Sequence, residues 1–233
     1  MRRLLPIFSF AIFCASLTGC RQGVSREVLA TVLSVRGEAI WAMEGRNDFR
    51  PITSQTKFGA GSIARTFQEA QIDVALVPGS LAQISGNSEL KIEKLKLTKD
   101  GNETDDGMRS RIVRVELNRG KITILFQSRD QSQMLFTIGT RHATISADAN
   151  CLFQIEVENA KTRLTCVRGN VNISRANRQT VMEAGYFQEW PSDRPAPISA
   201  VDDARGQIDI TDTLEAEREL QKLQSKQQSR RPF

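Results

Sequence analysis

Residues 116–124, ELNRGKITI, place an Arg-Gly pair between two runs in which apolar and polar side chains alternate. The same arrangement recurs in residues 33–41, LSVRGEAIW, and in residues 165–173, TCVRGNVNI. Alternation with a period of two is typical of half-buried β-strands, and glycine readily adopts the backbone angles of sharp bends and bulges. We therefore expect the glycine of each pair to lie at a corner of a layered β-structure. These glycines are Gly37, Gly120 and Gly169.

Strand-like alternation continues on both sides of these corners. It covers most of residues 29–191, in runs of about five to eight residues that end at Gly, Pro, Asn or Asp. No segment there has the 3.6-residue apolar period of a helix. The Arg-Gly pairs are unequally spaced, which argues against a regular repeat array. The sequence therefore predicts an all-β domain of about a dozen short strands, layered or solenoid-like, in residues 29–191.

The N-terminus carries the features of an export signal. Two arginines precede an apolar stretch, residues 4–17, which is shorter than the ~20 residues that a membrane-spanning helix needs. The stretch ends in Leu-Thr-Gly-Cys, which resembles the lipobox of bacterial lipoproteins, where the cysteine receives lipid and begins the mature chain. We expect residues 1–19 to be a signal peptide, Cys20 to be lipidated and residues 20–28 to form a tether. An ordinary secreted protein is the alternative.

Charge and location narrow the class of partner. Arg21 follows the cysteine, where lipoproteins retained at the inner membrane often carry Asp, so the resemblance favours the outer membrane, facing the periplasm. No later segment is long and apolar enough to cross a membrane, so we expect the lipid to be the membrane attachment. Loss of Arg2 and Arg3 with the signal lowers the formal net charge from +5 to +3. This mild charge, together with export, argues against a nucleic-acid partner.

Two cysteines remain, because Cys14 leaves with the signal and Cys20 carries lipid. In an oxidising envelope we expect Cys151 and Cys166 to form a structural disulfide. A hairpin with the four-residue loop 157–160 would place them opposite each other, with Cα atoms about 4.5 Å apart; a register slipped by two would separate them by about 7–8 Å. Two cysteines without a nearby histidine are too few for structural zinc, and they lack the C-x-x-C spacing of a redox pair.

The composition changes after the last β-like run. Residues 191–199, PSDRPAPIS, are typical of a Pro-rich linker, and residues 212–231 favour a helix, with Asp212 and Glu215 spaced as a capping box. The apolar side of this helix is thin, so a flexible helix and a helix that docks on a partner both fit. We therefore describe residues 192–233 as a linker with a helical or disordered tail. The apolar residues are Leu214, Leu220 and Leu223.

Catalytic chemistry finds little support in the sequence. His142 is the single histidine, it lies in an alternating run, and no G-x-S-x-G nucleophile elbow accompanies it. Carboxylate pairs lie in polar loops, without the burial that tunes a general acid. Neither a P-loop nor a dinucleotide-binding fingerprint is present. We therefore expect no enzymatic activity and no cofactor.

Two further groups of residues suggest binding. The polar segment 96–111 holds four potential calcium ligands, but Arg111 stands where an EF-hand needs its bidentate glutamate, so we expect a solvated loop and no metal. Four aromatic residues would form a sugar-stacking platform if they were exposed, but core and edge packing is the interpretation that we favour. The calcium candidates are Asp100, Asn102, Asp105 and Asp106. The aromatic residues are Trp41, Phe49, Tyr186 and Trp190.

Residues 57–95, KFGAGSIARTFQEAQIDVALVPGSLAQISGNSELKIEKL, resemble the first half of a FecR-family domain, in which a Thr turn and a Pro-Gly-Ser corner precede a strand of alternating apolar residues. The second half is similar and ends in VMEAGYFQEW at 181–190. The resemblance adds Gly79, in the Pro-Gly-Ser corner, and Gly185, in the second half, to the expected corners. Asn150-Cys151 replaces the Gly-Thr of the family. The matching residues are Thr66, Ala70, Val74, Leu76, Gly79, Ser80, Phe153, Gly169, Val171, Ala184 and Gly185.

This resemblance implies an all-β envelope domain. The proteins that give the family its name span the inner membrane and relay the state of an iron-siderophore receptor to a sigma factor. With no internal membrane-spanning helix and no evident anti-sigma region, we expect the binding module here without the relay. The expected function is a non-catalytic, lipid-anchored periplasmic module that binds an envelope protein and assists signalling or assembly. A carbohydrate- or peptidoglycan-binding module is the alternative.

Overall fold

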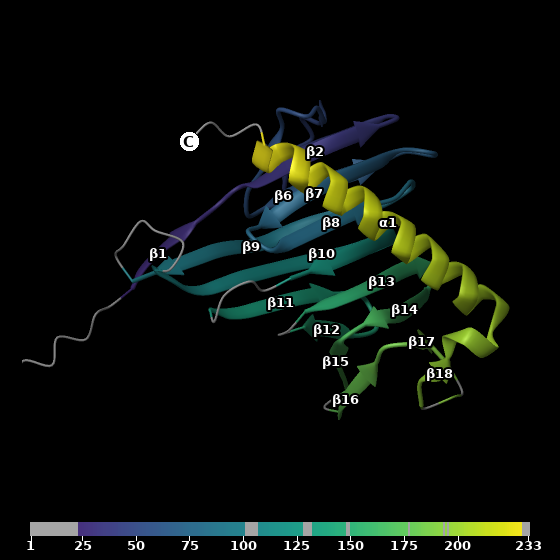
Figure 1. The fold of residues 1–233 in the computed structure, drawn as a ribbon. Helices are drawn as coiled ribbons and strands as arrows, with labels where there is room; N and C mark the ends of the chain where they lie inside the picture. Colours follow the sequence, from purple (N-terminus) through teal and green to yellow (C-terminus); the bar gives the residue numbers. More distant parts are fainter. Residues whose placement is uncertain are drawn as a thin grey trace, which may run out of the picture.

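The computed structural model describes residues 23–100, 107–127, 132–147, 150–176, 178–192, 194 and 196–229. The expected signal peptide and Cys20 lie outside the described residues, as do Asn102, Asp105 and Asp106. The described chain forms two β-sheets that pack face to face, with one long helix across the outer face of one sheet (Figure 1). The prediction of a layered all-β domain is confirmed, with eighteen strands in the described residues rather than about a dozen.

The first sheet, called sheet A, is antiparallel except for one parallel pair, β10 (Met108–Phe126) with β11 (Gln133–Gly139). β1 (Val24–Glu27) pairs with the far end of β9 (Glu89–Lys99). The order of the sheet is β4 (Arg50–Pro51), β3 (Ala39–Met43), β6 (Ser62–Thr66), β9, β10, β11, β12 (Thr144–Ala147), β15 (Asn170–Arg175) and β16 (Arg178–Glu183).

The second sheet, called sheet B, is antiparallel throughout and shares β10 with sheet A. Residues 108–119 of β10 pair with β9 in sheet A, whereas residues 120–126 pair with a strand of sheet B. The order of sheet B is β5 (Lys57–Phe58), β2 (Ala30–Arg36), β7 (Gln71–Val77), β8 (Ser80–Ile84), β10, β13 (Cys151–Glu158), β14 (Lys161–Arg168), β17 (Tyr186–Trp190) and β18 (Ile198–Ser199).

Each Arg-Gly pair lies where the chain passes from one sheet to the other. Gly37 separates β2 of sheet B from β3 of sheet A, and Gly169 separates β14 of sheet B from β15 of sheet A. At Gly120, β10 stops pairing with β9 of sheet A and begins to pair with β13 of sheet B. The φ angle of Gly120 is +86°. A Cβ atom at Gly120 would overlap the backbone of Ser88, so this crossing has room for glycine alone.

The hydrophobic core lies between the two sheets. The alternating apolar residues of β10 are buried on both sides of the crossing: Val113, Val115 and Leu117 before it, and Ile122 and Ile124 after it. Three phenylalanine rings join the strands at the centre, with ring centroids 5.9 Å and 6.1 Å apart. These rings belong to Phe126, Phe136 and Phe153. Strand alternation in the sequence therefore corresponds to core-facing and outward-facing positions.

Helix α1 (Ala204–Ser229) follows a short 3₁₀ turn, η2 (Ala200–Asp202), and lies across the outer face of sheet B (Figure 1). The helix starts eight residues before the expected capping box. The backbone N–H of Gly206 donates to Asp203 Oδ1 at 2.7 Å, which is the bond that an N-cap residue accepts. Asp212 lies inside the helix, so the prediction of a capping box at Asp212 and Glu215 is wrong. Within the described part of the chain, no helix has the length and apolar character needed to cross a membrane.

The β13–β14 hairpin differs from the expected register by two residues. Phe153 lies opposite Cys166 rather than opposite Leu164, and the turn consists of Asn159 and Ala160, both with positive φ. Two central residues with positive φ are typical of tight two-residue hairpin turns. A slip of two residues keeps every side chain on its original face, so the apolar pattern alone could not distinguish the two registers.

This register moves Cys151 away from the position opposite Cys166. Cys151 lies beside Gly169 instead, and the structure has two buried thiols rather than a disulfide at these positions. The Cys166 thiol donates to the carbonyl of Gly169 at 3.5 Å. Burial raises the pKa of the Cys166 thiol from 9.0 to about 11, so the thiol is protonated at neutral pH.

Candidate functional site

The outer face of sheet B carries a row of polar side chains that crosses six strands. Its members are register partners, each directly opposite the next, and they alternate with core residues along their strands. Most of them are buried although they point away from the core, because α1 covers them. We call this the polar row. Its residues are Ser34, Asp73, Gln83, Thr123, Gln154 and Thr165.

Two other rows flank the polar row. On one side lies a small apolar row that packs against Leu214 and Leu220 of α1. On the other side lies a charged row, in which Lys121, Glu156 and Arg163 are successive register partners. The helix therefore rests on polar residues, with an apolar strip along one side and charges along the other. The apolar row consists of Ala75, Leu81, Leu125 and Leu152.

Half of the buried residues on the face of α1 that meets the sheet are polar. Its buried residues recur every three or four positions, which is the spacing of one helical face. Two of them are carboxylates, and their side chains are 7% and 8% exposed. A search for apolar periodicity misses such a face, because Leu220 is its one large apolar member. The buried residues of this face are Gly206, Asp209, Thr213, Ala216, Glu217 and Leu220.

Arg163 holds the N-terminal end of α1 on the sheet. Its guanidinium donates to Asp209 at 2.6 Å, to Glu189 at 2.6 Å and to Asp203 at 3.1 Å, and it lies 3.7 Å from the ring centre of Phe187. Burial alone would lower the pKa of Arg163, but the hydrogen bonds to Glu189 and Asp209 raise it on balance. The cation is therefore fixed among three carboxylates, two of which belong to the helix segment.

Asp209 and Asp203, the two carboxylates of the helix segment, accept further hydrogen bonds. Gln154 and Thr165 of the polar row donate to Asp209 at 3.4 Å and 3.1 Å. The pKa of Asp203 lies below its ordinary value, chiefly because the Gly206 N–H donates to it and also because Arg163 lies near. Thr213 donates to Gln154 at 3.3 Å. The polar row and the helix thus share one hydrogen-bond network.

Two arginines of the Arg-Gly pairs bind the middle of α1. Arg168 makes a bidentate ion pair with Glu217, at 2.6 Å and 2.9 Å, and Arg36 contacts Glu219 at 2.7 Å. Burial works against ionisation of Glu219, but hydrogen bonds from Gln71 and Gln83 and the charge of Arg36 lower its pKa on balance. The sheet crossings therefore also position cations for the helix.

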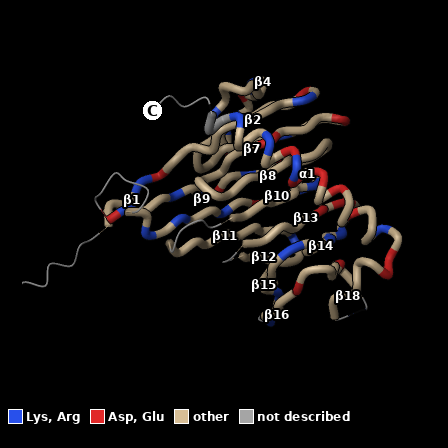
Figure 2. The backbone as a smooth tube through the Cα atoms, in the orientation of Figure 1, with Lys and Arg blue, Asp and Glu red and all other residues tan. Residues whose placement is uncertain are grey.

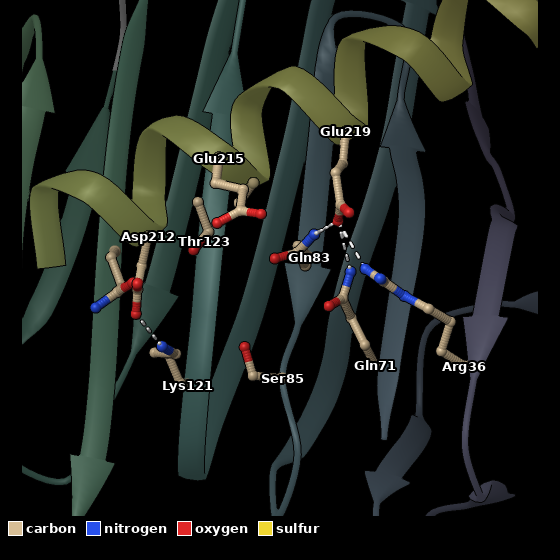
Figure 3. A pocket seen from close by; sticks show the side chains of 11 residues that line it. Arg36, Gln71, Gln83, Ser85, Lys121, Thr123, Asp212, Glu215 and Glu219 are labelled. Carbon is tan, nitrogen blue, oxygen red and sulfur yellow. Dashed lines mark hydrogen bonds and ion pairs between the residues drawn. The ribbon is translucent and has the colours of Figure 1, made fainter. Parts of the chain in front are cut away.

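A cavity of about 260 Å³ remains between α1 and sheet B (Figure 3). Lys121 lies at one end, paired with Asp212 at 3.1 Å, and the Glu219 cluster lies at the other. The side chain of Glu215 extends from the helix between them, above Thr123. The walls are almost entirely polar, so the cavity suits water or a polar side chain better than an apolar ligand.

The residues considered for catalysis and glycan binding do not come together. His142 Nδ1 lies 2.8 Å from Thr162 Oγ1, and its pKa is lowered by burial and by the charges of Arg141 and Arg175. Trp190 is buried in the core, which agrees with the packing interpretation and removes Trp190 from a sugar platform. Trp41 is half-buried and packs edge-on against Phe58 at 5.9 Å.

The remaining aromatic residues and metal candidates are also dispersed. Phe49 lies beneath the guanidinium of Arg65 at 4.4 Å, and Tyr186 is partly exposed at the start of β17. In the ranges that the structure describes, no group of three or more His, Cys, Asp or Glu side chains could hold a metal ion. The five expected corner glycines all have positive φ, from +70° to +86°. They are Gly37, Gly79, Gly120, Gly169 and Gly185.

Comparison with known proteins places part of this fold in a family. No protein of curated function matches the chain. Two crystal structures of a provisionally assigned anti-sigma factor from Parabacteroides distasonis, at 2.50 Å and 1.65 Å resolution, are similar with 14% and 13% identity and a TM-score of 0.43. Each alignment covers 58% of this chain and 57% of the other, so the chain matches a little over half the length of those proteins. This likeness is too remote to transfer a function.

The sequence pattern of the FecR protein family matches residues 62–172. The match begins at the start of β6 and ends within β15, and it includes the crossing in β10 and the β13–β14 hairpin. Strands β1 to β5 and helix α1 lie outside it. Residues 62–172, a little under half of the chain, therefore match the FecR family.

Proposed function

We propose that this chain is a non-catalytic, lipid-anchored protein of the bacterial cell envelope that binds a protein partner on the periplasmic side. The observation that carries the proposal is the FecR domain in residues 62–172. The family's namesake proteins are regulators that act by binding other envelope proteins. The proposed role here is the binding step, as an accessory to envelope signalling or assembly.

The N-terminal sequence supports the anchor. Cys20 ends a lipobox-like sequence and lies only three residues before Gly23, where the described structure begins. A lipid on Cys20 would therefore hold β1 and the sheets close to the bilayer, and the absence of Asp at position 21 favours the outer membrane. Glycan binding has less support, because Trp190 packs in the core rather than on the surface.

In-cell cross-linking of the tagged full chain, followed by mass spectrometry, tests this proposal. A Cys20→Ala variant removes the lipidation site, and a Cys14→Ala variant is the matched control because Cys14 lies within the signal. We expect one dominant protein partner with the natural chain and with Cys14→Ala, and its loss with Cys20→Ala. Glycan fragments without a consistent protein partner would overturn the proposal, as would a partner that is captured equally well without Cys20.

A further inference from the structure

We propose that the outer face of sheet B is the partner-binding surface, and that the partner supplies an acidic α-helix which takes the place of α1. This inference rests on the proposed function and names the surface and the chemistry of the partner. The occupant is suggested by α1 itself, which shows what kind of element this face accepts.

Charge complementarity is the first support. The helix segment presents four carboxylates to four cations of the sheet, in separate ion pairs along its length: Asp209 with Arg163, Asp212 with Lys121, Glu217 with Arg168 and Glu219 with Arg36. The N···O distances run from 2.6 Å to 3.1 Å. Figure 2 shows acidic and basic positions along α1 and the neighbouring strands. A second helix with acids at the same spacing would meet the same cations.

The composition of the interface is the second support. The core between the sheets is separate from α1, and the apolar contact of the helix is confined to the small cluster around Leu220. At its β7 end the polar row also has hydrogen bonds within the sheet: Asp73 accepts hydrogen bonds from Ser34 at 2.5 Å, from Gln71 at 3.1 Å and from Gln83 at 3.0 Å. Interfaces of this polar kind resemble exchangeable contacts rather than cores. Release of α1 therefore exposes a polar surface and leaves the sandwich intact.

The incomplete fit of α1 is the third support. Ala216 is one of the residues of α1 that line the cavity, and its methyl group is too small to fill it. A partner helix with a longer polar side chain at this position would reach Ser85 and Thr123 on the cavity wall. We therefore expect the natural partner helix to carry acidic residues at the positions equivalent to Asp209, Glu217 and Glu219. At the position equivalent to Ala216 we expect a larger polar residue.

Binding of a labelled peptide with the sequence of residues 203–226 to the purified full chain tests the inference. Fluorescence anisotropy would compare the natural chain with a Glu217→Gln/Glu219→Gln variant, which weakens the chain's own helix but keeps the receiving surface. Because the resident helix competes, we expect the peptide to bind this variant about tenfold more tightly than the natural chain. An Arg36→Gln/Arg168→Gln variant weakens the receiving surface, and it should show no such gain.

Controls separate this result from misfolding. An Arg218→Gln/Lys222→Gln variant changes two exposed positions of the same helix that do not line the cavity, and it should bind the peptide as the natural chain does. Cooperative thermal unfolding of each variant shows that the sandwich is intact. A peptide with Ala216→Gln should bind more tightly than the natural peptide. Equal binding to all variants, or no binding to any of them, would overturn the inference.

Dimer formation and in-cell cross-linking identify the element that binds the outer face of sheet B. A dimer of the Glu217→Gln/Glu219→Gln variant that forms by helix exchange would make a second copy the occupant, and it would overturn the partner assignment. The same variants, cross-linked in cells, separate the two proposals. Unchanged partner capture by Arg36→Gln/Arg168→Gln would overturn this inference and leave the proposed function standing. Loss of capture in that variant alone would support both.

Discussion

Arg163 and Asp209 form an ion pair with an N···O distance of 2.6 Å, and both side chains are only 7% exposed. Removal of one partner from a buried pair leaves an uncompensated charge, which typically costs about 3–5 kcal/mol. We therefore expect Arg163→Met to lower the free energy of unfolding by about that amount. Urea unfolding of the natural chain and the variant would measure the difference.

Arg50→Met is the matched control for this change. Its ion pair with Asp48 has side chains that are 69% and 48% exposed, so water already screens it. We expect a change below about 1 kcal/mol, as is usual for surface pairs. A double variant, Arg163→Met/Asp209→Leu, should recover much of the loss because no charge remains buried. If Arg163→Met and Arg50→Met had equal effects, the buried network would not stabilise the helix contact.

Gly120 and Gly45 offer a second matched comparison. Their φ angles are +86° and +75°, so alanine is strained at both positions. A Cβ at Gly120 overlaps Ser88, whereas a Cβ at Gly45 meets nothing within 4 Å. We expect Gly45→Ala to cost roughly 1 kcal/mol and Gly120→Ala to cost at least about 3 kcal/mol or to prevent folding. Thermal unfolding would show this, and equal melting temperatures would contradict the assignment of β10 to both sheets.

The Cys166 thiol gives a pH prediction. Its pKa is 9.0 ordinarily and about 11 in the folded protein, so the folded state binds this proton more tightly than the unfolded state. The resulting stabilisation is complete below pH 9 and is lost as the pH rises from 9 to 11, by on the order of 2 kcal/mol. Cys166→Ala should therefore show a shallower loss of stability than the natural chain in this range.

Thiol labelling checks the same point independently. After unfolding without a reductant, a maleimide reagent should label both Cys151 and Cys166. A protein that resists labelling until it is reduced would contain the disulfide that the sequence suggested. In that case Cys166 would not titrate, and the natural chain and Cys166→Ala would lose stability in parallel above pH 9.

The fold class could be predicted from the sequence because strand alternation directly reports which residues face a core. Val113, Val115 and Leu117 alternate in the sequence, and all three are buried in the structure. The register of the β13–β14 hairpin could not be predicted in the same way. A slip of two residues preserves the alternation, and the choice depends on the backbone angles of Asn159 and Ala160.

The docked helix was harder to predict for a different physical reason. The apolar stripe of residues 212–231 is thin, which fits a flexible tail, but α1 packs through Asp209, Thr213 and Glu217. In a sequence, polar and acidic residues of this kind are typical of a solvated helix face unless the side chains that bind them are known. The partners of the two carboxylates, Arg163 and Arg168, lie in β14, 46 and 49 residues earlier in the chain. Pairing these cations with the carboxylates of the tail is the one signal in the sequence that could have found the contact.

Hydrogen exchange of the α1 amides in the purified full chain most directly tests whether ion pairs hold the helix on sheet B. Salt screens exposed pairs such as Arg36 with Glu219 and Lys121 with Asp212, so protection of α1 should depend on ionic strength. We predict that amides of residues 209–220 exchange about tenfold faster in 1 M salt than in low salt, while those of β10 keep their protection. If the α1 amides exchanged at the rate of β10 in both conditions, or showed no protection in either, α1 would not be a separable element held by these pairs.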